Sequence, residues 1–578
     1  MSALRLVVFS GKRPQEILRL LDQVQRDAVG AQVCGVLYHQ RARKTLAQRL
    51  RAIYSKLGKR GYLKYAAREA FRRTKRWCAI PVDGAIRFIH ACPREPMPSH
   101  EVSLVDLAKR LQEIGAELFV TADMHSAEAQ EFVSRQQADL GVVYGTGLLK
   151  RTLFGIPRFG SINLHKRKVP DYRGGGPVGL WELLDNRAEI GITVHQVDDS
   201  LDTGGVLRSS TIPIGPYDNL ESLALKATVV GADLICAVIR DVMAGKSSPR
   251  QQIGESKVYR APSDAEKLSY EKELSKRRPR YSGHRTRSVP KLLVRSIVFL
   301  PVVLIRNWVY RWKKAFPVVI LYHHIITDRP HHLGTPTAEF ARQIAFLRKF
   351  YRIASLEQAM QMLRKGDVPQ PTVVLSFDDG YADNYVNLRA VAQHYDIPVF
   401  LFVSTGHVSS GTPFGHDRKR DQEEFAPLSW EQVGLLHRSG FAFGCHTRNH
   451  FDCGSTDVPV LSEEIEGSRT ELALRASIWS EYFSFPWGMP KNMSEEALQV
   501  AKSSFTYVFA AAGGTNVIGS DPQTVLLRRV DYPATLWELE LALQCVLNFD
   551  TWRNIFPYFF EPRPRSLPLA LSKEKANQ

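Results

Sequence analysis

The stretch PTVVLSFDDG (residues 371–380) decides the fold of the C-terminal half, because it is an apolar run that ends directly in two adjacent carboxylates. A short apolar run bounded by polar residues is typical of a buried strand in a parallel sheet. Helical patterns separate it from five similar runs: FPVVILYHHI (316–325), IPVFLFVSTG (397–406), FAFGCHTRNH (441–450), YFSFPWG (482–488) and TYVFAA (506–511). Strands that repeatedly end in polar clusters predict a β/α barrel with its chemistry at the C-terminal strand ends.

Two of these strand ends carry residues that suit a metal centre. Asp378 and Asp379 follow one strand, and His446 and His450 follow another. Two histidines four residues apart can face one ion when they enter a helix, and a carboxylate completes a set that leaves positions open for water and substrate. One carboxylate of an adjacent pair can bind the ion while the other acts as a base. The pattern predicts metal-dependent hydrolysis.

These residues resemble the motifs of the NodB-like polysaccharide deacetylases of carbohydrate esterase family 4. The matching stretches are SFDDG (376–380), HTRNH (446–450) and SFPWG (484–488), the last similar to the aromatic motif of the substrate groove. The resemblance implies that Zn²⁺ or a similar divalent ion is held by Asp379, His446 and His450. It also implies that Asp378 deprotonates the attacking water, and that Pro486 and Trp487 line the groove.

The general acid is not where this family usually has it, because no histidine follows His450. The opening strand of the domain ends in Tyr322, His323 and His324, and deacetylases that resemble permuted members of the family carry their histidine at this early strand. The first and last strands of a closed barrel are neighbours. We therefore expect His323 to be the acid, with His324 as the substitute; the alternative is that His323 is hydrogen-bonded inside the core.

The N-terminal half has its own alternation of apolar runs and helical patterns, from residue 4 to about residue 260. This alternation predicts a separate α/β domain with a parallel or mixed, Rossmann-type sheet. The runs are LRLVVFS (4–10), AQVCGVLY (31–38), AELFVTA (116–122), DLGVVYG (139–145), GSINLH (160–165) and EIGITVHQV (189–197).

A second set of reactive residues lies between residues 161 and 207. Asn163 and His165 are two apart on a predicted strand and therefore project to the same face. An amide and an imidazole side by side can polarise a carbonyl and hold an oxyanion, and Asp202 can orient or charge the imidazole.

This segment resembles the folate-dependent formyltransferases, on the motifs NLH (163–165), PDYRG (170–174) and LDTG (201–204). The resemblance covers roughly residues 1–262. It implies formyl transfer from 10-formyltetrahydrofolate to a primary amine, with Asn163, His165 and Asp202 as the catalytic trio. It also implies that the loop residues Tyr172, Arg173 and Gly174 contact substrate or cofactor.

The sequence departs from the formyltransferase pattern in two places. Residues 166–169 read KRKV where Pro-Ser-Leu-Leu is usual, so the contacts of that loop are open. The C-terminal barrel of the tRNA-modifying members is not evident, which favours an amino sugar as acceptor and argues against a nucleic-acid partner. A tRNA-directed formyltransferase remains an alternative.

The net charge of +18 comes from two segments. Residues 41–76 contain 14 Lys and Arg with one acid, and residues 276–314 contain 12 with none. The first segment reads as basic helices at 44–77 that form either a solvated insertion or a surface for an anionic partner. In the second, an apolar run with tryptophans and flanking basic residues fits either a connecting helix or a peripheral contact with an anionic membrane through residues 285–315. Its nine uninterrupted apolar residues (297–305) are too few to span a bilayer, and Pro301 interrupts the run.

The expected organisation is therefore a formyltransferase-like domain (1–262), a basic linker (263–315), a deacetylase-like barrel (316–560) and a tail (561–578). Seven scattered cysteines do not form a disulfide framework, so we expect a cytoplasmic protein, peripheral at the inner face of the membrane if residues 285–315 bind it. The two sites predict a bifunctional enzyme that formylates an amino sugar and removes either acetyl or formyl from a sugar amide. Its substrate would be an amino sugar or N-acetyl sugar carried by a nucleotide or a lipid. The competing class is a carbohydrate-binding scaffold with decayed sites.

Overall fold

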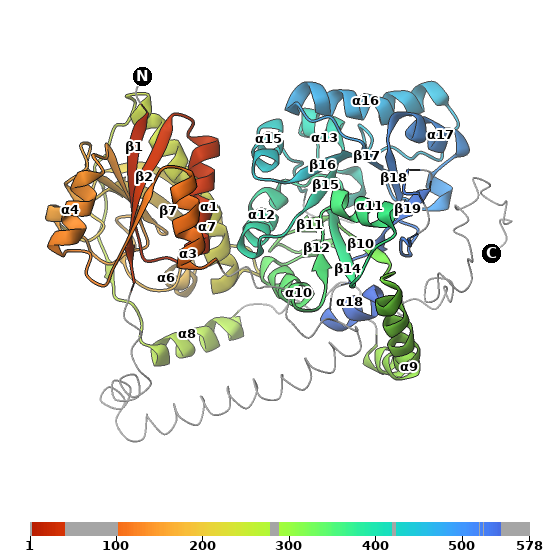
Figure 1. The fold of residues 1–578 in the computed structure, drawn as a ribbon, viewed down its shortest axis with the longest axis horizontal. Coiled ribbons are helices and arrows are strands. Elements are labelled where there is room, and N and C mark those ends of the chain that lie inside the picture. Colours follow the sequence, from red (N-terminus) through yellow and green to blue (C-terminus); the bar gives the residue numbers. More distant parts are fainter. Residues whose placement is uncertain are drawn as a thin grey trace. The chain divides into compact units, whose positions relative to one another are not determined.

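The computed structural model describes residues 3–40, 102–277, 288–418, 424–518, 521–523, 525–533 and 535–544. The chain divides into two compact units, the first built mainly of residues up to 274 and the second mainly of residues from 275 (Figure 1). Each unit has its own sheet and covering helices, which confirms the predicted α/β class for both halves. The basic segment at 44–77 and the tail at 561–578 lie outside the described residues.

The first unit has a seven-stranded mixed sheet with the strand order β3-β2-β1-β4-β5-β7-β8. The first five strands along the chain run parallel, and β7 and β8 are antiparallel to their neighbours. The order changes direction at β1, and such a switch point opens a crevice at the C-terminal strand ends. The strands are β1 (Leu4–Ser10), β2 (Ala31–His39), β3 (Glu117–Thr121), β4 (Leu140–Tyr144), β5 (Ser161–His165), β7 (Glu189–Gln196) and β8 (Val206–Pro213).

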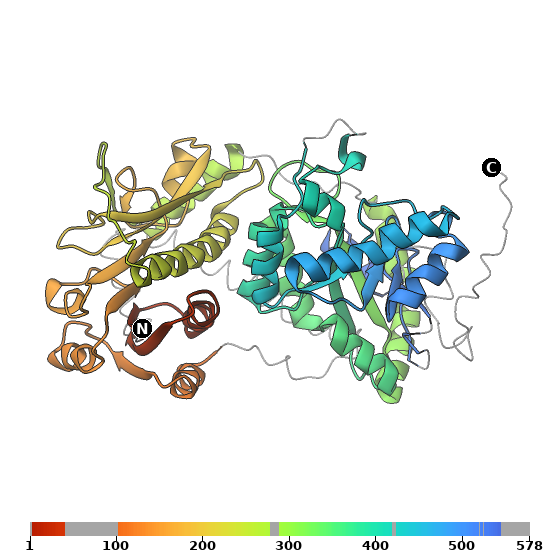
Figure 2. The ribbon, with the colours of Figure 1, turned by 90° about the horizontal axis from the view of Figure 1, so that it is seen from above.

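Amphipathic helices cover this sheet. In α1 (Pro14–Asp27), Ile17, Leu20, Leu21 and Val24 are buried at helical spacing, and a proline starts the helix, where its missing N–H costs nothing. Figure 2 shows the long α7 lying along the sheet. The other helices are α3 (Leu104–Glu113), α4 (Ala127–Arg135), α5 (Arg151–Phe154), α6 (Leu180–Leu184), α7 (Leu220–Met243) and α8 (Asp264–Arg277), and the short strands β6 (Arg173–Gly174) and β9 (Val258–Tyr259) pair beside them.

The segment expected to be a linker, 263–315, contains two helices, each packed on one unit. Helix α8 belongs largely to the first unit, because the ring of Tyr270 packs edge-on against Trp181 at 5.6 Å and Leu274 is buried. The first unit therefore extends beyond residue 262 by most of a helix.

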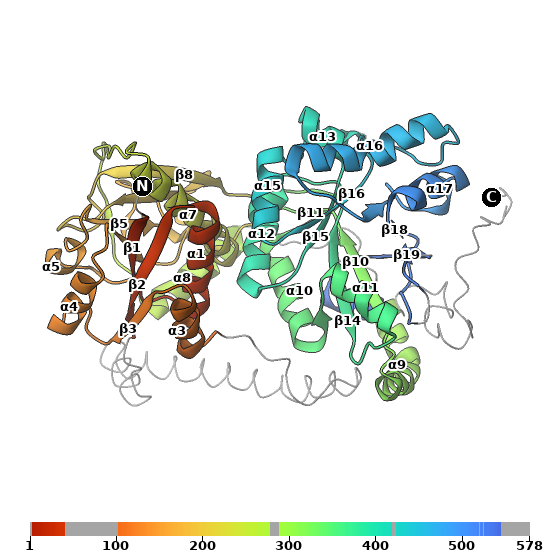
Figure 3. The same cartoon turned by 45° about the horizontal axis from the view of Figure 1, so that its top comes forward.

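The second unit is built on a parallel sheet that curls into a near-barrel, in the order β19-β18-β17-β16-β15-β14-β10-β20 (Figure 3). One edge of the sheet ends in β19, which pairs with β18, and the other ends in β20, which pairs with β10. In the chain, Arg529 alone separates β19 from β20, so this short stretch connects the two edges. The strands are β10 (Val318–His323), β13 (Arg352–Ile353), β14 (Thr372–Phe377), β15 (Phe400–Val403), β16 (Ala442–Cys445), β17 (Tyr482–Ser484), β18 (Tyr507–Ala510), β19 (Leu526–Arg528) and β20 (Val530–Asp531).

Helices between these strands surround the barrel, as the alternating sequence pattern predicts (Figure 3). Their ends follow local chemistry: Ser355 with Gln358, and Ser429 with Gln432, form capping boxes that satisfy the first amides of their helices. The helices are α10 (Thr337–Phe350), α11 (Leu356–Lys365), α12 (Asp383–Tyr395), α13 (Thr405–Ser410), α14 (Gly415–Arg418), α15 (Trp430–Arg438), α16 (Val458–Ala476), α17 (Glu495–Ser504) and α18 (Leu536–Leu543), with β11 (Ile325–Ile326) and β12 (Gly334–Thr335) paired near the barrel entrance.

Helix α9 (Val289–Lys313) precedes the barrel and continues through Pro301. Its inner face packs on α18, where Leu292, Phe299 and Val303 cluster with Leu541. The opposite face leaves an apolar stripe exposed, made of Val294, Ile297, Val298, Ile305, Trp308 and Trp312.

Two described helices are long and apolar enough to cross a membrane. In α7, 61% of the most apolar window is buried, as in a core helix, whereas in α9 the share is 28%. Because α9 continues through Pro301, it is longer than the nine uninterrupted apolar residues of the sequence indicate, and it reaches a spanning length by length and composition.

Candidate active sites

The candidate metal centre lies at the C-terminal ends of neighbouring barrel strands. Strand β14 is buried along its whole length and delivers Asp378 and Asp379, and β16 delivers His446. Parallel pairing through β15 brings these ends together. The ligand atoms of Asp379, His446 and His450 all lie within 4.8 Å of one another.

The chemistry of this group fits a divalent cation. Asp379 Oδ1 lies 3.2 Å from His450 Nε2 and 3.5 Å from His446 Nε2, and neither carboxylate oxygen has a hydrogen-bond partner among the described residues. His446 donates from Nδ1 to the Ser484 carbonyl at 2.7 Å, which leaves the Nε2 lone pair directed at the cluster. Burial lowers the pKa of His446 to about 4, so the ring is neutral and available as a ligand.

The two histidines are brought together by a turn, not by the helix that their spacing suggested. Residues 447–449 form this turn, in which Thr447 has a φ of 58° and His450 a φ of 50°. Asp379 also adopts a left-handed conformation, with a φ of 70°. Such conformations cost energy for residues other than glycine and are concentrated at functional sites.

Arg529 pairs with the carboxylate beside the metal centre, and the sequence analysis missed it. Its guanidinium donates to Asp378 Oδ1 at 2.6 Å and to Asp378 Oδ2 at 2.9 Å, and it also donates to Ser484 Oγ at 2.5 Å. Burial alone would raise the pKa of Asp378, but Arg529 and His446 hold it below its usual value. The sequence signal for this role was the position of Arg529, a charged residue that follows a short apolar run near the end of the predicted barrel.

His323 does not face this centre, contrary to expectation. Its ring stacks on Phe377 at 5.2 Å and packs against Phe340 and Tyr532, and burial holds its pKa well below the usual value. Successive strand residues point to opposite faces. His324 therefore projects on the other side, where it acts electrostatically on Asp378 and Asp379.

The aromatic motif adjoins the metal centre. The Trp487 ring lies 4.5 Å from the His450 ring in an edge-on arrangement and is about half exposed, with a φ of 57°. Pro486 is buried, and its carbonyl accepts from Gly488 N. Of Pro486 and Trp487, it is therefore Trp487 whose side chain is exposed and can contact a substrate.

A further histidine, His416, was not predicted to lie here. It comes from α14, in the loop region after β15, and its Nε2 is 3.7 Å from Asp379 Oδ2. Its ring lies 5.0 Å from that of His450. Sequence alone gives no signal for it, because its position depends on the path of a loop.

In the first unit, the structure brings Asn163, His165 and Asp202 together. Asn163 donates to Asp202 Oδ1 at 3.3 Å, and His165 Nδ1 lies 3.5 Å from Asp202 Oδ2. His165 Nε2 faces the Tyr172 carbonyl at 2.7 Å. Both ring nitrogens of His165 therefore face oxygen atoms, Nε2 that of the Tyr172 carbonyl and Nδ1 that of the Asp202 carboxylate.

Burial and hydrogen bonding shift the pKa values of His165 and Asp202 for different reasons. Burial lowers the pKa of His165 below its usual value, although Asp202 opposes this shift. Burial would raise the pKa of Asp202, but His195, His165 and the amide of Gly174 together lower it to about 2. Asp202 is therefore a carboxylate at neutral pH.

His195 is an additional member of this site. It lies opposite Asn163 in the antiparallel pairing of β5 with β7. Its Nδ1 donates to the Gln196 carbonyl at 2.7 Å, so its Nε2 accepts from the Asn163 amide at 3.2 Å. A buried histidine in an alternating strand was visible in the sequence, but its register against Asn163 was not.

The loop of Tyr172, Arg173 and Gly174 contributes backbone groups to this site. Gly174 N donates to Asp202 Oδ2 at 2.9 Å. The Tyr172 hydroxyl donates to Asp185, and Arg173 donates to Gln252 and Ser256, so both side chains are engaged within the protein. Gly174 has a φ of 92°, and a Cβ there would meet the Tyr259 carbonyl at 2.3 Å, so only glycine fits.

A pocket of about 180 Å³ opens beside His165, at the switch point between β1 and β4. It is smaller than the roughly 300–1,000 Å³ of pockets that enclose whole ligands. A ligand of that size would therefore extend beyond this pocket. Two lysines, Lys12 and Lys166, contribute to its lining.

Comparison with known families agrees with both sites. Residues 365–506 match the polysaccharide deacetylase family, and residues 90–239 match the formyl transferase family. The chain is thus a fusion of a formyltransferase domain with a polysaccharide deacetylase domain, two domains of enzyme families. The formyltransferase family implies a folate-type donor, and the deacetylase family is usually metal-dependent.

Individual relatives match parts of the chain. A methionyl-tRNA formyltransferase of Thermodesulfovibrio yellowstonii is 40% identical over 114 residues, covering 20% of this chain and 36% of its own. This chain spans under half the length of the curated relatives it matches. Among solved structures, the deacetylase PplD of Streptococcus pyogenes is 22% identical with a TM-score of 0.33, covering 39% of this chain and 96% of its own. A sugar N-formyltransferase from Shewanella is 12% identical with a TM-score of 0.28, covering 44% and 76%.

Proposed function

We propose that this protein is a bifunctional carbohydrate-modifying enzyme that removes an acyl group from a sugar amide and transfers a formyl group to a sugar amine. The observation that carries the proposal is the convergence of two independent reactive groups, one around Asp379 and one around Asp202. A decayed scaffold would not be expected to keep both intact.

The hydrolytic site acts on an N-acyl sugar. Asp379, His446 and His450 would hold a divalent cation, and two imidazoles with one carboxylate suit Zn²⁺. The cation would supply polarisation of the amide carbonyl and of the attacking water. Asp378 accepts a proton from this water, while Arg529 fixes the carboxylate in place. His324 is the residue placed to protonate the leaving amine. Trp487 offers an aromatic face for the sugar ring.

The transferase site joins a formyl group to an amine. 10-Formyltetrahydrofolate would supply the formyl group when bound. The Asn163 amide donates to the carbonyl oxygen as negative charge develops there, for which it must release Asp202 or His195. His165 accepts at Nδ1 the proton that the attacking amine loses, and Asp202 stabilises the charge that the ring then carries.

The acceptor is an amino sugar on an anionic carrier such as a nucleotide or lipid diphosphate. Lys12 and Lys166 line the pocket beside His165. Burial, together with Lys12, lowers the pKa of Lys166 to about 7. The Glu16 carboxylate lies 3.5 Å from the Lys12 amine and also acts electrostatically on Lys166. The two lysines therefore share one negative charge. An anionic group of the substrate would complete the charge balance.

The two reactions form a sequence in which the hydrolase removes acetyl and the transferase then formylates the exposed amine. A formyl group that the same chain adds and removes would cycle without gain, which disfavours deformylation. We infer a role in cell-surface glycan or nucleotide-sugar synthesis, which this pair of reactions would suit.

The exposed stripe of α9 supports a cytoplasmic protein that binds peripherally to the inner, anionic face of a membrane. The stripe is apolar, and basic residues with no acid flank it over residues 276–314. Since the inner face of α9 packs on α18, surface contact suits this helix better than a span. The described cysteines are free and buried, as in a reducing compartment.

A second candidate is formylation of methionyl-tRNA, which the names of the matching relatives favour. Incubation with methionyl-tRNA and with an amino nucleotide sugar, each with 10-formyltetrahydrofolate, separates the two acceptors. Formylation of the sugar alone supports the proposal, whereas formylation of the tRNA alone overturns it.

The hydrolytic assignment is tested by metal content. We expect about one divalent ion per chain after reconstitution, lost in Asp379→Ala and kept in Asp202→Ala. Absence of bound metal in the wild-type protein would instead support a binding module.

A further inference from the structure

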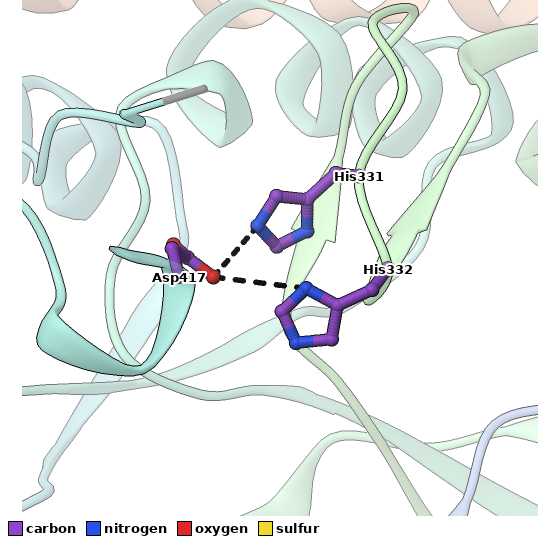
Figure 4. A group of neighbouring side chains, drawn as sticks. All are labelled: His331, His332 and Asp417. Carbon is purple, nitrogen blue, oxygen red and sulfur yellow. Dashed lines mark hydrogen bonds and ion pairs between the residues drawn. The ribbon is translucent and has the colours of Figure 1, made fainter. Parts of the chain in front are cut away.

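A second buried cluster lies beside the metal centre, made of His331, His332 and Asp417 (Figure 4). His331 and His332 come from the segment between β11 and β12, and Asp417 comes from α14. Asp417 Oδ1 is 2.9 Å from His331 Nε2 and 3.8 Å from His332 Nδ1. By residue type alone, these three side chains make a second candidate metal site.

The hydrogen bonds of His331 argue against a second ion. The backbone amide of Leu333 donates to His331 Nδ1 at 3.2 Å, so Nδ1 offers its lone pair. A neutral imidazole then carries its proton on Nε2, the atom that faces Asp417. A metal ligand needs a lone pair at that position, whereas this ring donates a hydrogen bond to the carboxylate.

Asp417 is instead the centre of a network that leads to Asp379. The Tyr381 hydroxyl donates its only proton to Asp417 Oδ2 at 2.9 Å. The Tyr381 oxygen must therefore accept from His416 Nε2, which lies 2.8 Å away. This assignment places a proton on His416 Nε2, 3.7 Å from Asp379 Oδ2.

We propose that Asp417 is a positioning residue for the metal-binding carboxylate of Asp379, and that it acts through Tyr381 and His416. The inference rests on the proposed metal-dependent hydrolysis. The network keeps the proton of His416 on Nε2, where it is donated to Tyr381, and so places a protonated nitrogen 3.7 Å from Asp379 Oδ2. Asp379 Oδ1, on the side of His446 and His450, is thereby left for the ion.

Two further contacts hold this network in place. His331 donates to Asp417 from the opposite side, and the Phe414 ring stacks on His416 at 5.6 Å. Burial would raise the pKa of Asp417, but hydrogen bonds from His331 and Tyr381 and the nearby His416 keep it below its usual value. Asp417 therefore stays an acceptor for both of its donors.

The isosteric variant Asp417→Asn tests the proposal most sharply. The new amide would donate to the Tyr381 oxygen, so Tyr381 would donate to His416 Nε2 and move the His416 proton to Nδ1. An Nε2 atom without a proton would then lie beside Asp379 Oδ2. Since partners of metal ligands typically contribute 10- to 100-fold in affinity, we expect Co²⁺ and Zn²⁺ to bind about 10- to 100-fold more weakly.

The readouts do not depend on enzyme turnover. Co²⁺ titration followed by its visible absorption, with Zn²⁺ competition, measures the affinity and the ligand geometry. Nitrogen-15 shifts of the histidine rings report the proton of His416 directly. The double variant Asp417→Asn/His416→Gln should recover affinity, because a Gln amide can turn its N–H towards Asp379, and a merely structural defect would not be rescued in this way.

His332→Gln is the matched control, since His332 has no part in the proton sequence from His331 to Asp379. We expect one ion per chain and an affinity within about threefold of wild type for this variant. Two ions in the wild type, one of them lost in His332→Gln, would overturn the proposal in favour of a second metal site. Unchanged affinity in Asp417→Asn would also overturn it, whereas a wild-type chain that binds no ion would instead refute the proposed hydrolysis.

Discussion

Arg529 holds Asp378 with two hydrogen bonds, at 2.6 and 2.9 Å, although Arg529 belongs to the stretch that closes the barrel and Asp378 follows β14. Both side chains are buried. Closure of the barrel and orientation of the candidate base therefore depend on the same residue.

Removal of Arg529 should affect both stability and hydrolysis. Arg529→Met leaves a buried carboxylate unpaired, and we expect the free energy of unfolding to fall by about 3 kcal/mol. The double variant Asp378→Leu/Arg529→Met should recover much of this loss but remain inactive in deacylation. Denaturant unfolding combined with a deacylation assay measures both effects. A single variant as stable as wild type would contradict the account.

The two adjacent histidines of β10 should behave differently. His324→Gln should lower the kcat of deacylation by about 10²-fold or more and leave metal affinity near that of wild type, because His324 projects to the side of the metal centre. His323→Leu should keep most of the activity, because His323 lies in an aromatic layer. Steady-state kinetics of both variants decide this, and the reverse pattern would restore His323 as the acid.

Lys166 should make binding of an anionic acceptor depend on pH. Its pKa is about 7, so its positive charge is present below pH 7 and lost above it. We therefore expect the KM of the acceptor to rise as the pH increases through 7, and Lys166→Met to raise KM about tenfold with little pH dependence near 7. The pH profile of formyl transfer measures this, and an unchanged profile in the variant would exclude Lys166 from acceptor binding.

The exposed stripe of α9 should determine membrane association. Replacement of Ile297, Val298 and Ile305 by Ser leaves the face packed on α18 untouched, so the fold should be kept while flotation with anionic vesicles is lost. The wild type should float less at high salt and with neutral vesicles. Equal flotation of variant and wild type would remove this role from α9.

The reactive residues at the ends of parallel strands could be predicted from the sequence. Asp379 and His446 each follow a buried apolar run, and parallel pairing necessarily brings such ends to one edge of a sheet. The choice between His323 and His324 could not be made in this way, because it depends on which face of β10 is turned inward, and a shift of one residue reverses the answer.

The missed residues depend on register and loop paths. His195 reaches Asn163 through an antiparallel register, and Arg529 reaches Asp378 through a one-residue break between two short strands. His416 lies in a short helix after β15. None of these distances can be read from periodicity, which describes each strand or helix separately.

The central claim is that one chain splits a sugar amide at one site and forms a new amide at the other. It is tested most directly by mass spectrometry of N-acetylated and free amino nucleotide sugars incubated with the metal-loaded protein, with and without 10-formyltetrahydrofolate. We expect a loss of acetyl that Asp379→Ala abolishes and His165→Ala does not, and a gain of formyl with the opposite pattern. Neither change with the wild-type protein, or both changes persisting in the two variants, would contradict the account.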